Sequence, residues 1–118
     1  MTVTIANLYA DCGEVYDNLT NGTTAATALL SKAGAEIALI TGTTTGFDLP
    51  VRNLADAHIC QQVLGGSAGA SISLGSISIG RKGILEMRER FIKSVSDTLA
   101  LSGYTFKVGN FMVEKVNG

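Results

Sequence analysis

Apolar residues recur every three or four positions in four separate segments, and this spacing constrains the fold more than any other feature of the chain. In an α-helix, such a spacing places the apolar side chains on one face. It predicts helices over about 4–19, 24–41, 49–64 and 84–101. Each helix has an apolar face to bury, so we expect the four to pack together as a small antiparallel bundle.

Polar residues and glycines indicate where these helices begin and end. Thr4 is expected to cap the first helix, and Thr23 or Thr24 the second. Gly42 is expected to close the second helix, because glycine accepts the left-handed backbone found just after a helix end. Gly34, inside that helix, suggests a close approach to another helix.

Residues 71–80 read SISLGSISIG and interrupt the helical pattern. Gly75-Ser76 suits a two-residue turn, because glycine accepts a positive φ angle, so the stretch predicts a β-hairpin. An isolated hairpin is marginally stable in water, and the serine face of this one lacks the charges that protect an exposed edge. We therefore expect either the chain's own helices or a neighbouring chain to cover its apolar face. That face holds Ile72, Leu74, Ile77 and Ile79.

The C-terminal segment 104–116, YTFKVGNFMVEKV, alternates apolar and polar residues. Alternation is typical of extended backbone, so the segment predicts a terminal hairpin or an extended arm. The expected fold class is mainly α, in a single domain over 1–118. It is a small antiparallel helix bundle with a β-hairpin inserted before the last long helix and an extended C-terminal arm.

The residue types that carry chemistry do not form a catalytic pattern. His58 is the only histidine, and Asp56, two positions away, lies on another side of the helix. Cys12 and Cys60 have no metal-ligand spacing, and Cys60 has no basic neighbour in sequence to activate its thiol. We predict that the protein is not an enzyme and that it holds no metal ion and no cofactor.

Two further motifs are better explained without catalysis or nucleotide binding. Residues 75–82 have the glycine spacing of a phosphate-binding loop, but Arg81 occupies the lysine position and Lys82 the Ser/Thr position. Glu86 and Glu89 lie beside Arg88 and Arg90 on the last helix, which is typical of a salt-linked surface. The outer face of this helix is expected to hold Arg88, Glu89, Arg90 and Lys93.

Charge divides the chain into an acidic first part and a basic second part. Charged residues make up only 16% of the 118, and the net charge is −1. Residues 1–48 carry five carboxylates and one lysine, whereas 49–118 carry eight basic and five acidic residues. The balance gives no overall attraction to nucleic acid. The alternative function is a small helical binding or regulatory domain, and its basic last helix is where nucleic acid would bind. The N-terminus does not resemble a signal peptide, and no run of about 18 apolar residues predicts a membrane span.

The order of these segments resembles the head–tail connector (adaptor) proteins of tailed bacteriophages. The resemblance is carried by TTAATALLSKAGAEIALITG, RNLADAHICQQVLGG, SISLGSISIGRK and LEMRERFIKSVSDTLALSGYTFKV, and it covers most of the chain. It implies a structural virion protein that forms a ring beneath the portal. Such a ring extends the DNA exit channel and binds a downstream neck or tail protein, with DNA passing only as cargo.

The resemblance also indicates which residues are expected at interfaces. The hairpin would contact another subunit or ring, on either the portal or the tail side, and the C-terminal arm would dock on a neighbour or on the portal. The acidic first helix and the basic last helix would supply two complementary sides of the ring. The expected interface residues are Ile72, Leu74, Ile77, Ile79, Arg81, Lys82, Tyr104, Phe106, Val108, Phe111 and Val113.

Overall fold

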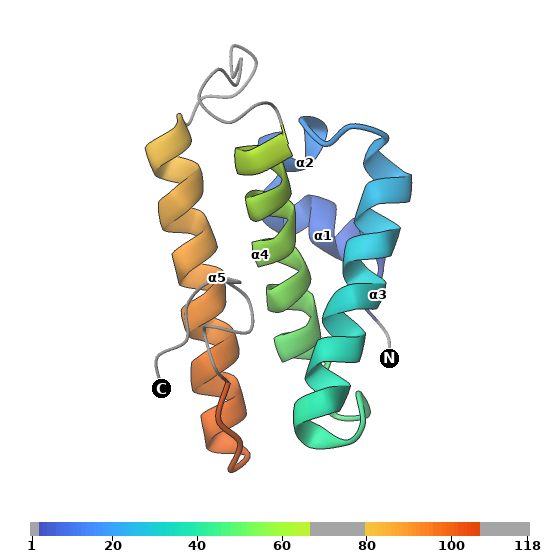
Figure 1. The fold of residues 1–118 in the computed structure, drawn as a ribbon, viewed down its shortest axis with the longest axis vertical. Helices are drawn as coiled ribbons and strands as arrows, with labels where there is room; N and C mark the ends of the chain where they lie inside the picture. The colour runs from blue at the N-terminus through green and yellow to red at the C-terminus, as the bar shows by residue number, and fades with distance from the viewer. Residues whose placement is uncertain (1–2, 67–79, 107–118) are drawn as a thin grey trace.

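The computed structural model describes residues 3–66 and 80–106, and these form five helices. The helices are α1 (Ile5–Cys12), α2 (Glu14–Asp17), α3 (Gly22–Thr41), α4 (Asp48–Gly66) and α5 (Arg81–Leu101). The helices α3, α4 and α5 lie side by side with alternating direction and with α4 in the middle, while α1 and α2 cross one face of this layer (Figure 1). None of these helices combines the length and the apolar character needed to cross a bilayer.

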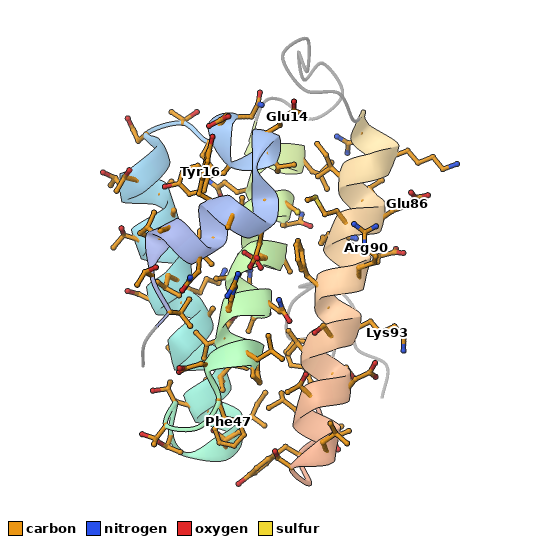
Figure 2. The ribbon with its side chains drawn as sticks, turned by 180° about the vertical axis from the view of Figure 1, so that it is seen from behind. Glu14, Tyr16, Phe47, Glu86, Arg90 and Lys93 are labelled. Carbon is orange, nitrogen blue, oxygen red and sulfur yellow. The ribbon has the colours of Figure 1, made fainter. Side chains whose placement is uncertain are left out.

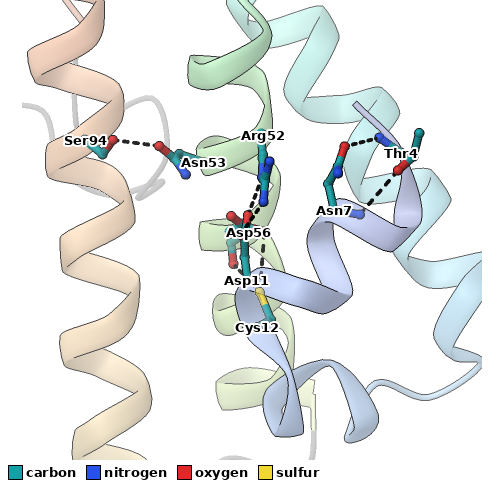
Figure 3. Close-up of polar contacts among 8 residues, drawn as sticks. All are labelled: Thr4, Asn7, Asp11, Cys12, Arg52, Asn53, Asp56 and Ser94. Carbon is teal, nitrogen blue, oxygen red and sulfur yellow. Dashed lines mark hydrogen bonds and ion pairs between the residues drawn. The ribbon is translucent and has the colours of Figure 1, made fainter. Parts of the chain in front are cut away.

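Helix α4 forms the centre of the core because other helices pack against it on several sides. It contacts α5 and α3 within the layer, and α1 and α2 across it. Every residue from Leu54 to Cys60 is buried as a result. The apolar spacing predicts that this helix buries one stripe of residues, and the residues of that stripe are buried. From Leu54 to Cys60, however, α4 is buried around most of its circumference. A hydrogen bond of 2.6 Å from Ser94 Oγ to Asn53 Oδ1 adds a polar link between α4 and α5 (Figure 3).

The first predicted helix, over 4–19, is in fact two helices separated by Gly13. Thr4 caps α1 as expected: its Oγ1 accepts from Asn7 N–H at 3.3 Å, and Asn7 Oδ1 accepts from Thr4 N–H at 2.9 Å. Gly13 has φ 52° and ψ −117°, a conformation that ends α1 and starts α2 in a new direction. The apolar spacing continues across this break, which is why a single helix was predicted.

Replacing Gly13 is expected to destabilise the fold, whereas the same change at Gly65 is not. A Cβ at Gly13 meets no atom within 4 Å, so the cost of Gly13→Ala arises from its positive φ and is about 1–2 kcal/mol. Gly65 lies in α4, has open space around it and has no positive φ, so Gly65→Ala should stabilise by about 0.5–1 kcal/mol. Urea unfolding of both variants measures the difference, and equal effects would show that the backbone at Gly13 is not strained for other residues.

The second predicted helix begins earlier than expected. Helix α3 starts at Gly22, and its N-cap is Asn21 in the left-handed region at φ 60°. The prediction that Thr23 or Thr24 caps this helix is therefore wrong. Gly42 closes α3 with φ 88°, as expected, and its N–H donates to Ala38 O at 2.7 Å.

The predicted fold class needs correction, because residues 3–66 and 80–106 contain helices and no strand. Most of the predicted hairpin, 71–79, lies outside the described residues. Its last residue, Gly80, is the N-cap of α5, so Arg81 and Lys82 are helical and α5 begins three residues before the predicted start. Of the predicted C-terminal arm, 107–116 also lies outside the described residues, and the part that is described, Tyr104–Phe106, packs back onto the bundle.

Candidate functional site

A polar cluster joins α1 to the middle of α4. Arg52 donates two hydrogen bonds to Asp11, from Nε to Oδ2 and from Nη2 to Oδ1, each 2.7 Å long (Figure 3). Burial on its own would raise the pKa of the Asp11 carboxyl, but the hydrogen bonds from Arg52 outweigh it and hold that pKa below its ordinary value. This bidentate ion pair fixes how α1 crosses α4.

Asp56 lies one turn after Arg52 and is fully buried. Its Oδ2 makes no hydrogen bond within the described residues, while its Oδ1 lies 3.5 Å from Cys12 Sγ. Burial, followed by the nearby Asp11 carboxylate, raises the pKa of Asp56 to about 9. The Asp56 side chain is therefore uncharged at neutral pH. The junction between α1 and α4 contains one charged carboxyl group, that of Asp11, and one uncharged carboxyl group, that of Asp56.

The two cysteines are buried beside Asp56. Cys12 Sγ also lies 3.9 Å from the carbonyl oxygen of Asp56, which is one turn before Cys60 in α4. Contact with the Cys60 thiol, followed by burial and the Asp56 carboxyl, raises the pKa of Cys12 above its ordinary value. Such a thiol is a weak nucleophile, because the reactive form is the thiolate.

His58 has a carboxylate partner that its own helix does not supply. Its Nε2 lies 2.5 Å from Glu36 Oε1 of α3, and only 5% of the histidine side chain is exposed. Both helices line an open cleft of about 360 Å³ beside this pair. The lining residues are Leu29, Lys32, His58, Gln61, Gln62 and Gly65.

The pair of His58 and Glu36 beside this cleft supplies one of the two groups that nucleophilic catalysis needs, namely the base. A histidine oriented by a carboxylate can serve as a general base. Nucleophilic catalysis also needs a hydroxyl or thiol within reach of the histidine, and the lining residues include neither. The geometry supports a cross-link between α3 and α4 better than a catalytic centre.

Two arginines of α5 connect it to α4, and one of them, Arg88, was predicted to lie on the outer face. Arg88 lies in the buried face of α5, between Ile84 and Ile92, and its Nη1 donates to Gln61 Oε1. Arg81 Nη1 donates to the carbonyl oxygen of Leu64, near the end of α4, at 3.1 Å.

The predicted interface residues fall in three different environments. Lys82 is exposed at the start of α5, whereas Phe106 is buried in the core and Tyr104 packs edge-to-face on Phe47, with ring centroids 5.8 Å apart. The structure therefore does not bring Lys82 and Tyr104 together. Phe106 does not lie on a free surface. Arg81, also in the predicted set, hydrogen-bonds the carbonyl oxygen of Leu64 as described above. The other seven lie outside the described residues: Ile72, Leu74, Ile77, Ile79, Val108, Phe111 and Val113.

Three leucines outside the predicted set are exposed. Leu39 of α3 and Leu101 of α5 expose 86% and 89% of their surface, and Leu49 of α4 exposes 52%. The outer edge of α5 is otherwise charged, with Glu86, Arg90 and Lys93 pointing away from the layer (Figure 2). Each of these side chains would gain free energy if a partner covered it. The helical phase could have identified them, since Leu39 and Leu101 each come two residues after a buried residue.

Comparisons with known proteins identify no relative. No family model, no curated protein sequence and no solved structure matches this chain. Within residues 3–66 and 80–106, no three His, Cys, Asp or Glu side chains gather in a way that could hold a metal ion.

Proposed function

We propose that this chain is a structural component of a phage virion neck. It forms a ring of identical subunits that joins the portal of the head to the next neck or tail protein and surrounds the channel through which DNA leaves. The proposal assigns no catalytic role to the chain. It draws on the resemblance to head–tail connector proteins and on the surface of the helical layer.

The observation that carries the proposal is the exposure of Leu39 and Leu101. Helices α3 and α5 bury their apolar stripes in the bundle, and apart from these two leucines their exposed residues are small, polar or charged. Leaving an apolar side chain in water forgoes about 1.5–3 kcal/mol that burial would provide. A subunit that works inside an assembly recovers this free energy at its interfaces.

The exposed face of α5 favours a protein partner over nucleic acid. Lys93 pairs with Asp97 at 3.1 Å, and Glu86 and Glu89 lie among the cations of the same helix. Nucleic-acid surfaces normally present clustered positive charge without interspersed carboxylates. A near-balanced charge also suits the wall of a channel through which DNA has to slide without binding tightly.

Assembly tests this function directly. We expect the purified chain, alone or mixed with the portal protein of the same genome, to sediment as a closed oligomer and to form rings in electron micrographs. The reading frames on either side of its gene should encode capsid and tail proteins. A monomer at every attainable concentration, with and without portal protein, would contradict the proposal.

A further inference from the structure

We infer that Cys12 and Cys60 form a disulfide that locks α1 onto α4 when the surroundings of the protein become oxidising. The two cysteines come from different helices, Cys12 from the end of α1 and Cys60 from the second half of α4. Both are buried in the core of one chain, so the inference does not depend on the proposed ring.

Cys12 lies against the part of α4 from which Cys60 projects. Its Sγ is 3.5 Å from Asp56 Oδ1 and 3.9 Å from the carbonyl oxygen of Asp56 (Figure 3). Side chains four positions apart share one face of a helix, and each leans toward the helix N-terminus. The Cys60 side chain therefore leans over the turn that begins at Asp56, and its thiol is in hydrogen-bonding contact with the Cys12 thiol.

A small movement of α1 turns this contact into a bond. The two sulfurs of a disulfide lie about 2.0 Å apart, so the thiols have to come closer than contact distance. Helix α1 has only eight residues and crosses one face of the layer formed by α3, α4 and α5 (Figure 1). It can therefore shift toward α4 without any change in how the three long helices pack.

Burial determines when the two thiols react. The exposed fractions are 3% for Cys12 and 0% for Cys60, so an oxidant reaches neither sulfur while α1 is docked. A short element at the outside of a fold opens locally at a lower free energy than the core unfolds. Opening of α1 takes Cys12 away from the Cys60 thiol and from the burial that raise its pKa. The reactive thiolate of Cys12 then forms at neutral pH.

A hydroperoxide completes the oxidation in two balanced steps. The Cys12 thiolate attacks one peroxide oxygen, so that an S–O bond forms and the O–O bond breaks, and the leaving oxygen takes up the proton that the thiol has lost. When α1 docks again, the Cys60 sulfur attacks the Cys12 sulfur. The S–S bond forms, the S–O bond breaks, and the oxygen leaves as water with the Cys60 proton. The two thiols together lose two electrons, which reduce the peroxide.

The disulfide changes what holds α1 in place. In the reduced protein, α1 is attached to α4 by apolar contacts and by the ion pair between Asp11 and Arg52. In the oxidised protein it is attached by a covalent bond that closes a loop containing α2 and α3. Closing such a long loop restricts the unfolded chain and stabilises the fold.

Peroxide treatment of the folded wild-type chain tests the inference. The reduced protein is treated with hydrogen peroxide without denaturant, then unfolded and alkylated with N-ethylmaleimide. We expect a monomer on a non-reducing gel, a mass lower by two hydrogen atoms, no bound maleimide, and a peptide map that joins Cys12 to Cys60. The melting temperature should rise by about 10 °C. Cys60→Ser is the control and should show neither the link nor the rise.

A second measurement tests whether the opening of α1 controls the reaction. Arg52→Gln removes the ion pair with Asp11 and should make the disulfide form about fivefold faster or more, because α1 opens more often. Lys93→Gln is the matched control, since it breaks an exposed ion pair within α5 and should leave the rate unchanged. Circular dichroism confirms that both variants are folded.

Each of the other outcomes contradicts part of the inference. A folded chain that keeps both thiols, stops at an oxidised Cys12 without a link, or links only to other chains overturns the disulfide. A disulfide that forms only after the chain is unfolded also overturns it. A disulfide that forms at the same rate in Arg52→Gln and in the wild type overturns the opening of α1 as the route.

Discussion

We expect the free energy of unfolding to fall by up to about 5 kcal/mol as the pH rises from about 5 to about 8.5. The cause is Asp56, whose pKa is raised to about 9 in the fold by burial and then by Asp11, whereas an aspartate in an unfolded chain titrates near pH 4. Between these two values the folded state holds a proton that the unfolded state has released. Stability therefore decreases by at most about 1.4 kcal/mol per pH unit over this interval.

Asp11 acts in the opposite direction at acidic pH. Its pKa is lowered in the fold, so its contribution to stability is present above the pKa of an unfolded aspartate and is lost as the pH falls through its folded pKa. Together the two carboxyls place the maximum of stability on the acidic side of neutral. Urea unfolding across this range, with a reductant to keep both cysteines as thiols, measures the slope.

Asp56→Asn is the variant that isolates this effect. An amide cannot ionise, so the variant should lose most of the pH dependence and gain about 2–5 kcal/mol over the wild type at about pH 8.5. Near pH 5 the two proteins should differ little. Asp97→Asn, which changes an exposed carboxyl, is the matched control and should retain the wild-type slope. A wild-type protein with the same stability at both pH values would show that Asp56 ionises freely in the fold.

The second large effect is expected at Leu54, in the middle of α4. Its side chain is 1% exposed in the helix that the rest of the fold packs around. Leu54→Ala should destabilise by about 3–5 kcal/mol, because it removes buried methyl groups and leaves a cavity that rigid neighbours cannot fill. The same change at Leu49, five residues earlier and half exposed, should cost less than about 1 kcal/mol. Comparable losses at the two positions would contradict the central place of α4.

The helices were predictable from the sequence because each buries a stripe at a regular spacing. The break at Gly13 was not, since Leu8, Cys12 and Val15 keep the spacing on both sides of it. The start of α5 was missed for a related reason: Gly80 was assigned to a strand, so the helix was expected only from Ile84. Arg88 was assigned to the outer surface by its charge, although its position one turn after Ile84 places it in the buried face.

The polar contacts were less predictable than the helices. Glu36 and His58 are 22 positions apart, and Arg52 and Asp11 are 41 apart. Such pairs depend on how the helices cross, which apolar spacing does not determine. The sequence showed that His58 had no partner in its own helix, and only the fold supplied Glu36.

The contact between Cys12 and Asp56 provides a label-free spectroscopic probe of the junction between α1 and α4. The S–H stretch of a thiol absorbs in a part of the infrared spectrum where other protein groups are silent, and its frequency responds to the strength of the hydrogen bond that the thiol donates. Cys60→Ser would leave Cys12 as the single source of this band. A shift of the band with pH would then record the ionisation of Asp56 inside the folded protein, separately from any change in unfolding.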